Sequence, residues 1–240
     1  MNKITADVIK KNFAETKHLE TIDGLKLAIL GSEWLEPFNT FIANIYSGGS
    51  EKFHLNEKEV AMLTEESAVY FPHTKLAAVL SPDDRLVATW GLILKDTREP
   101  GGLVLPLEKQ FHLNFDTIKQ QMNSDAVFFF NGWRTAIDKN IMHELGFDKP
   151  YSIRIFDMLL RILVEDFAEE SRFYMGIAEM ENIVLRYHRR IGIPWQKLGE
   201  AKSYLGAERY PCAFKLEEFE ATLKENYPER YDFVYKINKK

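Results

Sequence analysis

The sequence predicts an α/β (α+β) fold, with a mixed central sheet and helices on both of its faces. Residues 126–130 are apolar without alternation and rich in aromatic side chains, which is typical of a strand covered on both faces. Residues 151–170 repeat apolar side chains at helical spacing, which predicts a helix packed on a sheet. A second apolar run at 172–177 completes a strand, helix and strand unit, whose spacing implies a parallel crossover.

Composition and charge narrow the functional classes. The 240 residues are 45% hydrophobic, which indicates one globular domain at 1–240, with an N-terminal extension at 1–24 and a helical tail at 218–240. A net charge of −5 argues against a nucleic-acid binder, because phosphate contacts need clustered Lys and Arg. No apolar run reaches transmembrane length and the first residues lack a signal peptide's apolar core, so we expect a cytoplasmic protein.

Cysteine and histidine usage bears on redox and metal chemistry. The single Cys212 excludes an internal disulfide. It is either a core thiol or a nucleophile, and no Cys–His pairing is visible in the sequence. The six histidines include no HxxxH pair and no His/Cys cluster, so we predict no metal site.

The first elements are predicted to be a strand and a helix. Leu25–Leu30 is an apolar run that follows the turn sequence Asp23-Gly24, and it predicts the first strand. A helix begins after Ser32, because apolar side chains then repeat at helical spacing as far as Gly48-Gly49, which ends it.

A second helix and a hairpin are predicted next. Asn56–Ser67 has helical periodicity, with Val60 and Leu63 expected to face inward. Lys75–Leu80 and Leu86–Leu94 are apolar runs joined by a turn sequence, so they predict a β-hairpin.

The middle of the chain carries the predicted central strand. Leu107–Met122 places apolar side chains near one face and predicts a helix. The central strand occupies 126–133, and an irregular connection, Asp138–Pro150, leads to the helix at Tyr151–Glu170. Arg172–Ile177 predicts a second inner strand, parallel to the central strand and next to it.

The C-terminal part predicts a helix, two strands and a helical tail. The helix is Met180–Ile191, which Gly192 ends. Its expected inner face consists of Met180, Ile183, Val184, Tyr187 and Ile191. Trp195–Glu200 and Tyr210–Glu217 predict a closing pair of strands, and the charged segment 217–235 predicts a covering helix.

This order of elements resembles the GNAT N-acyltransferase fold, in which two parallel inner strands splay apart. Residues 186–193 resemble that superfamily's late helix ending in a glycine, and Tyr204-Leu205-Gly206 followed by Tyr210-Pro211 resembles its closing hairpin. Leu105-Pro106-Leu107-Glu108 and residues 132–137, Gly-Trp-Arg-Thr-Ala-Ile, resemble the long-chain branch. That branch comprises the N-acyl amino acid synthases and the acyl-homoserine lactone synthases.

The resemblance implies an acyl thioester, on coenzyme A or an acyl carrier protein, that lies between the two inner strands. A primary amine, such as an amino acid, would attack its carbonyl directly. Here backbone groups of Trp133, Thr135 and Ile137 would hold the pantetheine arm as a surrogate strand. Catalysis would be mostly positioning, with an N–H aimed at the developing oxyanion.

Three features depart from the pattern that the resemblance implies. The family's coenzyme A users carry a Gly-rich turn after the central strand, whereas Asp138–Pro150 contains a single glycine. The glutamate expected three residues before Arg134 is Asn131, which cannot accept a proton at neutral pH. The general-acid tyrosine, four residues before the helix-ending glycine, is His188, with Tyr187 beside it.

Each candidate catalytic residue has two interpretations. Asn131 shares a strand face with Phe129, and a polar group there needs a partner from either substrate or backbone. Tyr187 is either a core tyrosine or a general acid. His188 either protonates the leaving thiolate or is solvated, one helix position from the inner face. Arg134 has the opposite strand parity, and we expect it in a structural ion pair.

Further candidates flank the central helix and the acyl tail. Ser152 is either an N-terminal cap or, with Lys149 and Arg154, part of a phosphate site. The basic run Arg186, Arg189 and Arg190 is either a solvated face or a docking site for an acidic carrier protein. Side chains that either line the acyl or acceptor pocket or simply pack are Trp34, Phe38, Phe129 and Tyr204.

The predicted function is transfer of a long acyl group from a coenzyme A or carrier-protein thioester to a small-molecule primary amine. Two alternatives remain open: a short-chain acetyltransferase that uses acetyl-coenzyme A, and a non-catalytic module that binds acyl thioesters. The departures at Asn131 and His188 motivate the second alternative.

Overall fold

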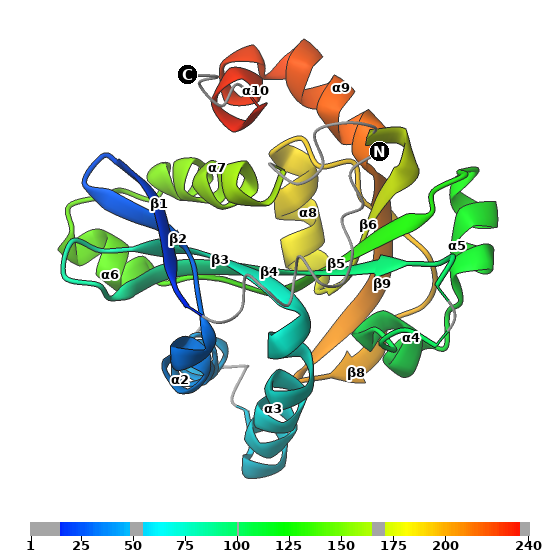
Figure 1. The fold of residues 1–240 in the computed structure, drawn as a ribbon, viewed down its shortest axis with the longest axis horizontal. Coiled ribbons are helices and arrows are strands. Elements are labelled where there is room, and N and C mark those ends of the chain that lie inside the picture. The colour runs from blue at the N-terminus through cyan, green and yellow to red at the C-terminus, as the bar shows by residue number, and fades with distance from the viewer. Residues whose placement is uncertain (1–14, 49–54, 100, 165–170, 236–240) are drawn as a thin grey trace. The chain divides into compact units, whose positions relative to one another are not determined.

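A computed structural model describes residues 15–48, 55–99, 101–164 and 171–235 (Figure 1). The chain divides into two compact units, the first comprising residues 1–93 and 133–163 and the second comprising residues 94–132 and 164–240. Strands β4 (Leu86–Asp96) and β5 (Phe128–Ile137) contribute residues to both units. No helix in the described ranges is both long and apolar enough to cross a bilayer.

In its described part, the first unit contains antiparallel strands in the order β1-β2-β3-β4, together with the second half of β5. β1 (Lys17–Ile22) pairs with β2 (Leu25–Ile29), β2 pairs with β3 (Thr74–Leu80), and β3 pairs with β4. The second half of β5 also bonds to β4, because the Thr89 hydroxyl donates to the Arg134 carbonyl at 3.2 Å. The predicted hairpin of β3 and β4 is confirmed, and all seven residues of β3 are buried.

Three long helices cover these strands. Figure 1 shows α7 (Tyr151–Val164) on one side of them and α2 (Leu35–Gly48) and α3 (Glu57–Tyr70) on the other. Short 3-10 turns at Ser32–Trp34 and Phe71–His73 precede α2 and follow α3. Aromatic pairs join the layers: Phe156 of α7 stacks on Trp90 of β4 with ring centroids 4.9 Å apart. These contacts form the apolar core of the first unit.

Two elements of this unit are absent from the sequence prediction. β1 lies inside the predicted N-terminal extension, and its mostly exposed polar side chains give no apolar signal. α6 (Lys139–Glu144) lies inside the connection that was expected to be irregular, and its six residues are too short to show periodicity. The central helix is confirmed as far as Val164, and its predicted end at 165–170 lies outside the described residues.

The inward face of α3 differs in part from the prediction. Leu63 is fully buried as expected, but Val60 is 37% exposed, so its inward placement is wrong. The helix instead turns the polar side chains of Glu66 and Ser67 toward the core. A pattern built on apolar residues misses a helix face that carries a buried glutamate.

The second unit contains the parallel pair. The first half of β5 pairs in parallel with β6 (Tyr174–Met180), which confirms the predicted pairing of the two inner strands. β6 pairs antiparallel with β9 (Ala207–Lys215). β7 (Gln196–Lys197) and β8 (Lys202–Tyr204) each pair with β9 as well. A short 3-10 turn at Ser171–Phe173 precedes β6.

The closing strands differ from the predicted pair in their bounds. Leu205 and Gly206 both have positive φ, 49° and 72°, and form the two-residue turn of a hairpin between β8 and β9. β9 therefore begins at Ala207 rather than at Tyr210, and only two residues of the predicted strand 195–200 are paired.

In the described part of the second unit there are five α-helices. The predicted helix 107–122 is in fact two, α4 (Pro106–Phe111) and α5 (Phe115–Met122). The break occurs because His112 adopts a left-handed φ of 56° and the Asn114 side chain then caps α5, accepting from the Thr117 N–H at 2.8 Å. The other three are α8 (Asn182–Arg190), α9 (Leu216–Asn226) and α10 (Pro228–Tyr235), so the predicted helical tail is confirmed in its described part.

Candidate functional site

The parallel pairing of β5 and β6 stops part-way along both strands. Pairing runs from Phe128↔Tyr174 to Asn131↔Ile177 and goes no further, although β6 continues to Met180 and β5 to Ile137. On its other edge β6 stays paired with β9 throughout, up to Met180 itself. The parallel ladder thus ends at Asn131, as the resemblance implies for an acyl-thioester site.

One face of this sheet segment packs against α8 and α9. Phe130 and Phe214 both pair with Gly176, and their ring centroids are 5.5 Å apart. The Phe214 ring also contacts Trp195 at 4.5 Å and Phe219 of α9 at 5.7 Å. We call this side the α8 face, and Figure 1 shows α8 and α9 on one side of these strands.

Strand residues that alternate with Phe130, Gly176 and Phe214 point to the opposite face of this sheet segment. Asn131 pairs with Ile177, and both point away from the α8 face together with Phe129. The ring of Phe115 in α5 packs on Phe129 at 4.5 Å. We call this second side the α5 face. Phe129 is fully buried against α5, as a core residue would be.

Asn131 ends the ladder with a buried side chain on the α5 face. Its exposed fraction is 0%, and its Nδ2 donates to the carbonyl of the next residue, Gly132, at 2.8 Å. Its Oδ1 is buried and accepts no hydrogen bond from any described residue. Leaving a buried acceptor unmatched costs about 1–3 kcal/mol, so the oxygen is well suited to a donor from a ligand.

The buried face of α8 differs from the predicted one. Leu185 and His188 are buried, whereas Ile183 is 65% exposed and Val184 is 36% exposed. The predicted inward placement of Ile183 and Val184 is wrong, and so is the solvated interpretation of His188. The true face contains a histidine, which a search for apolar periodicity does not count.

The environment of His188 makes its imidazole neutral. Burial lowers the pKa of His188 to about 4. Its ring lies over Trp195, with centroids 6.4 Å apart, and the half-buried Tyr187 ring is 6.0 Å away. Through Trp195 the histidine belongs to the α8 face, opposite Asn131. The structure therefore brings Tyr187 and His188 together but places Asn131 on the other side of the strands.

In the first unit, β5 bends at Arg134. This arginine has a left-handed φ of 51° inside a strand, the geometry of a bulge, and Trp133 and Arg134 are both buried instead of alternating. The Arg134 guanidinium donates to Glu66 of α3 at 3.0 Å, so the predicted ion pair is confirmed. Sequence reasoning did not find Glu66, and its signal was a charge on the inward face of a helix.

The aromatic and backbone candidates of the first unit lie around this bend. The ring of Trp133 packs on Phe38 of α2 with centroids 5.5 Å apart, and Phe38 is fully buried. Trp34 is half-buried at the start of that helix. Thr135 and Ile137, further along β5, are also half-buried. The structure thus brings Trp133 and Phe38 together as core, while the proposed pantetheine contacts of β5 stay predictions.

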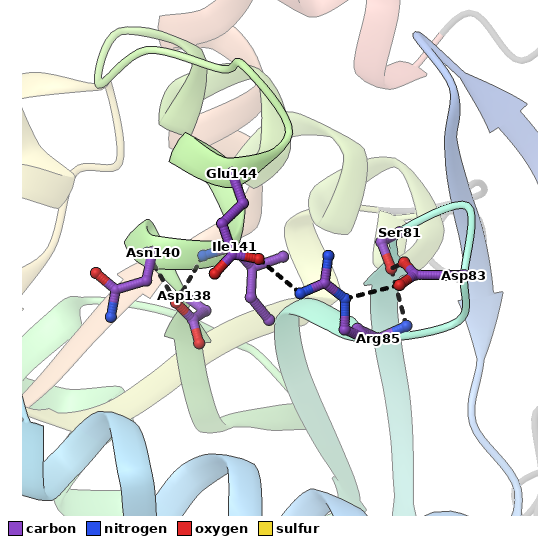
Figure 2. Close-up of polar contacts among 7 residues, drawn as sticks. All are labelled: Ser81, Asp83, Arg85, Asp138, Asn140, Ile141 and Glu144. Carbon is purple, nitrogen blue, oxygen red and sulfur yellow. Dashed lines mark hydrogen bonds and ion pairs between the residues drawn. The ribbon is translucent and has the colours of Figure 1, made fainter.

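The start of α6 carries a carboxylate. Figure 2 shows the Asp138 side chain accepting from the N–H groups of Asn140, at 2.8 Å, and Ile141, at 3.1 Å. In the same view Arg85 is shared between two acids, Asp83 at 2.9 Å and Glu144 at 2.7 Å. Asp138 occupies the N–H groups that an anion would need at this helix start.

The residues expected at the start of α7 make other contacts. The Ser152 hydroxyl donates to the Lys149 carbonyl at 2.8 Å, so its role as a cap is wrong, and Asp148 instead accepts from the Tyr151 N–H at 3.2 Å. The Arg154 guanidinium lies 3.8 Å from an Asp23 carboxylate oxygen. A phosphate site formed by Lys149, Ser152 and Arg154 stays a prediction.

Three further predictions concern the second unit. Cys212 is buried, and burial raises its pKa to about 12, so its thiol is protonated at neutral pH as in a core residue. Tyr204 is buried beneath the Arg209 guanidinium, 5.7 Å from the ring centroid. Arg186, Arg189 and Arg190 are exposed, although Arg189 donates to the Trp195 carbonyl at 2.7 Å.

Among the described residues no group of three or more His, Cys, Asp or Glu side chains could hold a metal ion.

One carboxylate in this region was missed by the sequence reasoning. Glu179 lies on β6, two residues beyond Ile177, the last residue of β6 in the parallel ladder. The available signal was a single charged residue in the otherwise apolar strand Tyr174–Met180.

No protein-family model matches the sequence, and no curated protein matches it. Solved structures do. FeeM, an N-acyl amino acid synthase from uncultured soil microbes, matches with a TM-score of 0.60 over 84% of this chain and 97% of that chain, at 12% identity. This chain has a GNAT-type fold. The predicted fold class and its mixed sheet are thereby confirmed.

Other GNAT-type structures match less closely. An acetyltransferase of the GNAT family from Staphylococcus aureus Mu50 gives a TM-score of 0.48 at 12% identity and covers 80% of this chain and 99% of that chain. The acyl-homoserine lactone synthase LasI gives 0.47 at 12% identity and covers 79% of this chain and 88% of that chain. The fold assignment rests on the FeeM match, which at 12% identity shows the fold alone, and the chemistry is argued from the residues.

Proposed function

We propose that this chain is an N-acyltransferase that moves an acyl group from a thioester donor to a primary amine. The observation that carries the proposal is the end of the β5–β6 ladder at Asn131↔Ile177. An extended pantetheine arm has its own amide groups and can continue a ladder that the protein leaves unfinished. The GNAT-type fold, shared with an N-acyl amino acid synthase, supports the same reaction.

The reaction needs little covalent help from the protein. The amine nitrogen attacks the thioester carbonyl carbon, a tetrahedral intermediate forms, and the C–S bond then breaks to release the thiol. Holding the two reactants in line supplies most of the rate increase, and a backbone N–H near the carbonyl oxygen stabilises its developing charge. The buried Oδ1 of Asn131 is suited to accept an N–H of the amine and so to orient its lone pair.

We propose an acyl carrier protein as the donor in preference to free coenzyme A. Both present the acyl group on the same pantetheine arm, but coenzyme A also carries a pyrophosphate. The connection Asp138–Pro150 after β5 contains a single glycine, so it lacks the Gly-rich turn that would bind such a group. A long acyl chain is proposed from the likeness to an N-acyl amino acid synthase, and an amino acid is the proposed acceptor.

The test is a thiol-release assay with three donors and a panel of the twenty amino acids. The donors are lauroyl-carrier protein, lauroyl-coenzyme A and acetyl-coenzyme A. We expect amine-dependent release, with the highest kcat/KM for the lauroyl-carrier protein. Fastest release from acetyl-coenzyme A would make the chain a short-chain acetyltransferase. Binding of the lauroyl donors without amine-dependent release would leave only a binding module, the alternative that Asn131 and the neutral His188 favour.

A further inference from the structure

Glu179 stands at the point where the parallel ladder ends. It follows Ile177, the last residue of β6 that pairs with β5, by two positions. Side chains alternate along a strand, so Glu179 lies on the same face as Ile177 and Asn131, the α5 face. The β6–β9 register is continuous from Met175 to Met180, so no bulge reverses this assignment.

The side chains of Asn131 and Glu179 border the same space from the neighbouring strands β5 and β6. Neighbouring strands lie about 4.8 Å apart and successive residues on one face about 6.6 Å apart. A glutamate two positions beyond the last pair therefore reaches the space next to the Asn131 amide, directly or through one water. Glu179 of β6 can thus take the place of the glutamate that the resemblance implies at position 131 of β5.

The side chain of Glu179 is partly covered, and the neighbouring strand β9 carries an arginine on the same face. The residue is half-buried, and its Oε1 is fully buried. On β9, which pairs with β6, alternation puts Arg209 on the α5 face, two residues before Pro211, the partner of Glu179. The Arg209 guanidinium lies 3.9 Å from Glu181.

Several charged groups of α4, α5 and β8 make contacts elsewhere. Glu108 of α4 pairs with Lys95 at 2.7 Å. Within α5, Asp116 pairs with Lys119 at 2.8 Å. Lys202 of β8 donates to a backbone carbonyl of α4 at 3.1 Å. His188 lies on the α8 face.

We propose that Glu179 is the general base of the acyl transfer and that Asn131 orients the amine for it; the assignment rests on the proposed function. As the amine nitrogen bonds to the carbonyl carbon, Glu179 takes one of its protons. The C–S bond then breaks, and the departing sulfur receives that proton from Glu179. The sum is amine plus thioester giving amide plus thiol, with no other reactant.

The test compares Glu179→Gln with the wild type in the 240-residue chain, and Glu208→Gln, at an exposed position of β9, serves as the control. The donor is lauroyl-pantetheine, which carries no phosphate, and the acceptor is the amino acid that gives the wild type its fastest thiol release. Binding of the thioether analogue of lauroyl-pantetheine is measured separately. Glu179→Asp, which keeps the carboxylate, is the conservative variant.

We expect E179Q to lower kcat about 100-fold or more at pH 7, to flatten the acid limb of the pH–rate profile, and to leave analogue binding within twofold. E179D should retain part of the rate, and E208Q should match the wild type. An E179Q chain within threefold of the wild-type rate would overturn the assignment and leave the proposed function intact. Loss of analogue binding in parallel with rate would show a structural role instead.

A wild type that releases no thiol with any amino acid would contradict the proposed function itself, and the base assignment with it. The two failures are therefore distinguishable, since one appears in the wild type and the other only in E179Q.

Discussion

Arg134 combines a costly backbone conformation with a buried charge. A left-handed φ of 51° costs an L-residue about 1–2 kcal/mol, and a buried guanidinium needs an acid beside it. Glu66 supplies that acid at 3.0 Å, with both side chains almost wholly covered. The pair ties α3 to the bend in β5 and stacks the guanidinium near the Trp133 ring, 5.4 Å from its centroid. Breaking the pair should therefore be felt beyond the two residues.

Replacement of Glu66 by Gln should destabilise the chain by about 3–5 kcal/mol, because it leaves the Arg134 charge buried without a counter-charge. The free energy of unfolding in urea measures the loss. Glu65→Gln, one position away and exposed, should change it by less than about 0.5 kcal/mol. Equal effects from the two variants would show that the ion pair contributes nothing specific.

His188 gives the stability a dependence on acid pH. Its pKa is about 4 in the folded chain, against about 6.5 when unfolded, so the unfolded chain binds more protons between these values. The contribution of the neutral His188 to the free energy of unfolding should then be fully present above pH 6.5. It should fall by about 3 kcal/mol as the pH drops to 4. Urea unfolding at several pH values measures this slope.

His188→Phe keeps an aromatic ring beside Trp195 and should remove that part of the slope. His143→Gln, an exposed site on α6, is the control and should retain it. An unchanged slope in the Phe variant would assign the acid sensitivity to other groups.

At the scale of single elements, the sequence predicts most helices and strands and misplaces the faces that carry polar residues. The hairpin of β3 and β4 is predicted correctly because both strands are continuous apolar runs. On α8, burial of His188 turns the helix away from the face that Ile183 and Val184 suggest. The burial of polar groups such as Glu66 and His188 depends on tertiary contacts, which sequence periodicity does not reveal.

Close packing between β6 and β9 predicts a strict requirement for glycine. A Cβ built on Gly176 would lie 2.1 Å from the Phe214 ring, whose other contacts are Phe130 and Trp195. Gly176→Ala should lower the unfolding free energy by about 1–3 kcal/mol, as overpacking of a core does. Thermal unfolding measures it. Gly199→Ala, where the nearest atom would be at 3.7 Å, is the control and should be near neutral.

For the whole molecule, the order of elements was predictable while the end of the parallel ladder was not. Apolar runs and helical stripes locate β5, α7 and β6 and imply the parallel pairing of the two strands. The sequence carries no mark for the last pair, because Asn131 and Ile177 are followed by residues that read as ordinary strand. Candidate catalytic residues therefore had to come from a resemblance, and the face on which Glu179 lies became clear only from the strand register.

The single cysteine offers a probe of global opening. Cys212 is buried in β9, and its thiol has a pKa of about 12, so it should react slowly with a disulfide reagent in the native state. In urea it should react rapidly, with one thiol per chain. The labelling rate should track the unfolding free energy of variants such as Gly176→Ala. Fast labelling of the native chain would show that β9 opens without global unfolding.

The outermost strand of the first unit is built to discourage unwanted partners. β1 begins with a lysine, exposes most of its side chains and slips its register between His18 and Glu20. A charged edge strand with an irregular register pairs poorly with a strand of another molecule. Concentrated solutions of the protein should therefore resist fibril growth by strand pairing at β1. The same exposed strand is a suitable place to attach a tag.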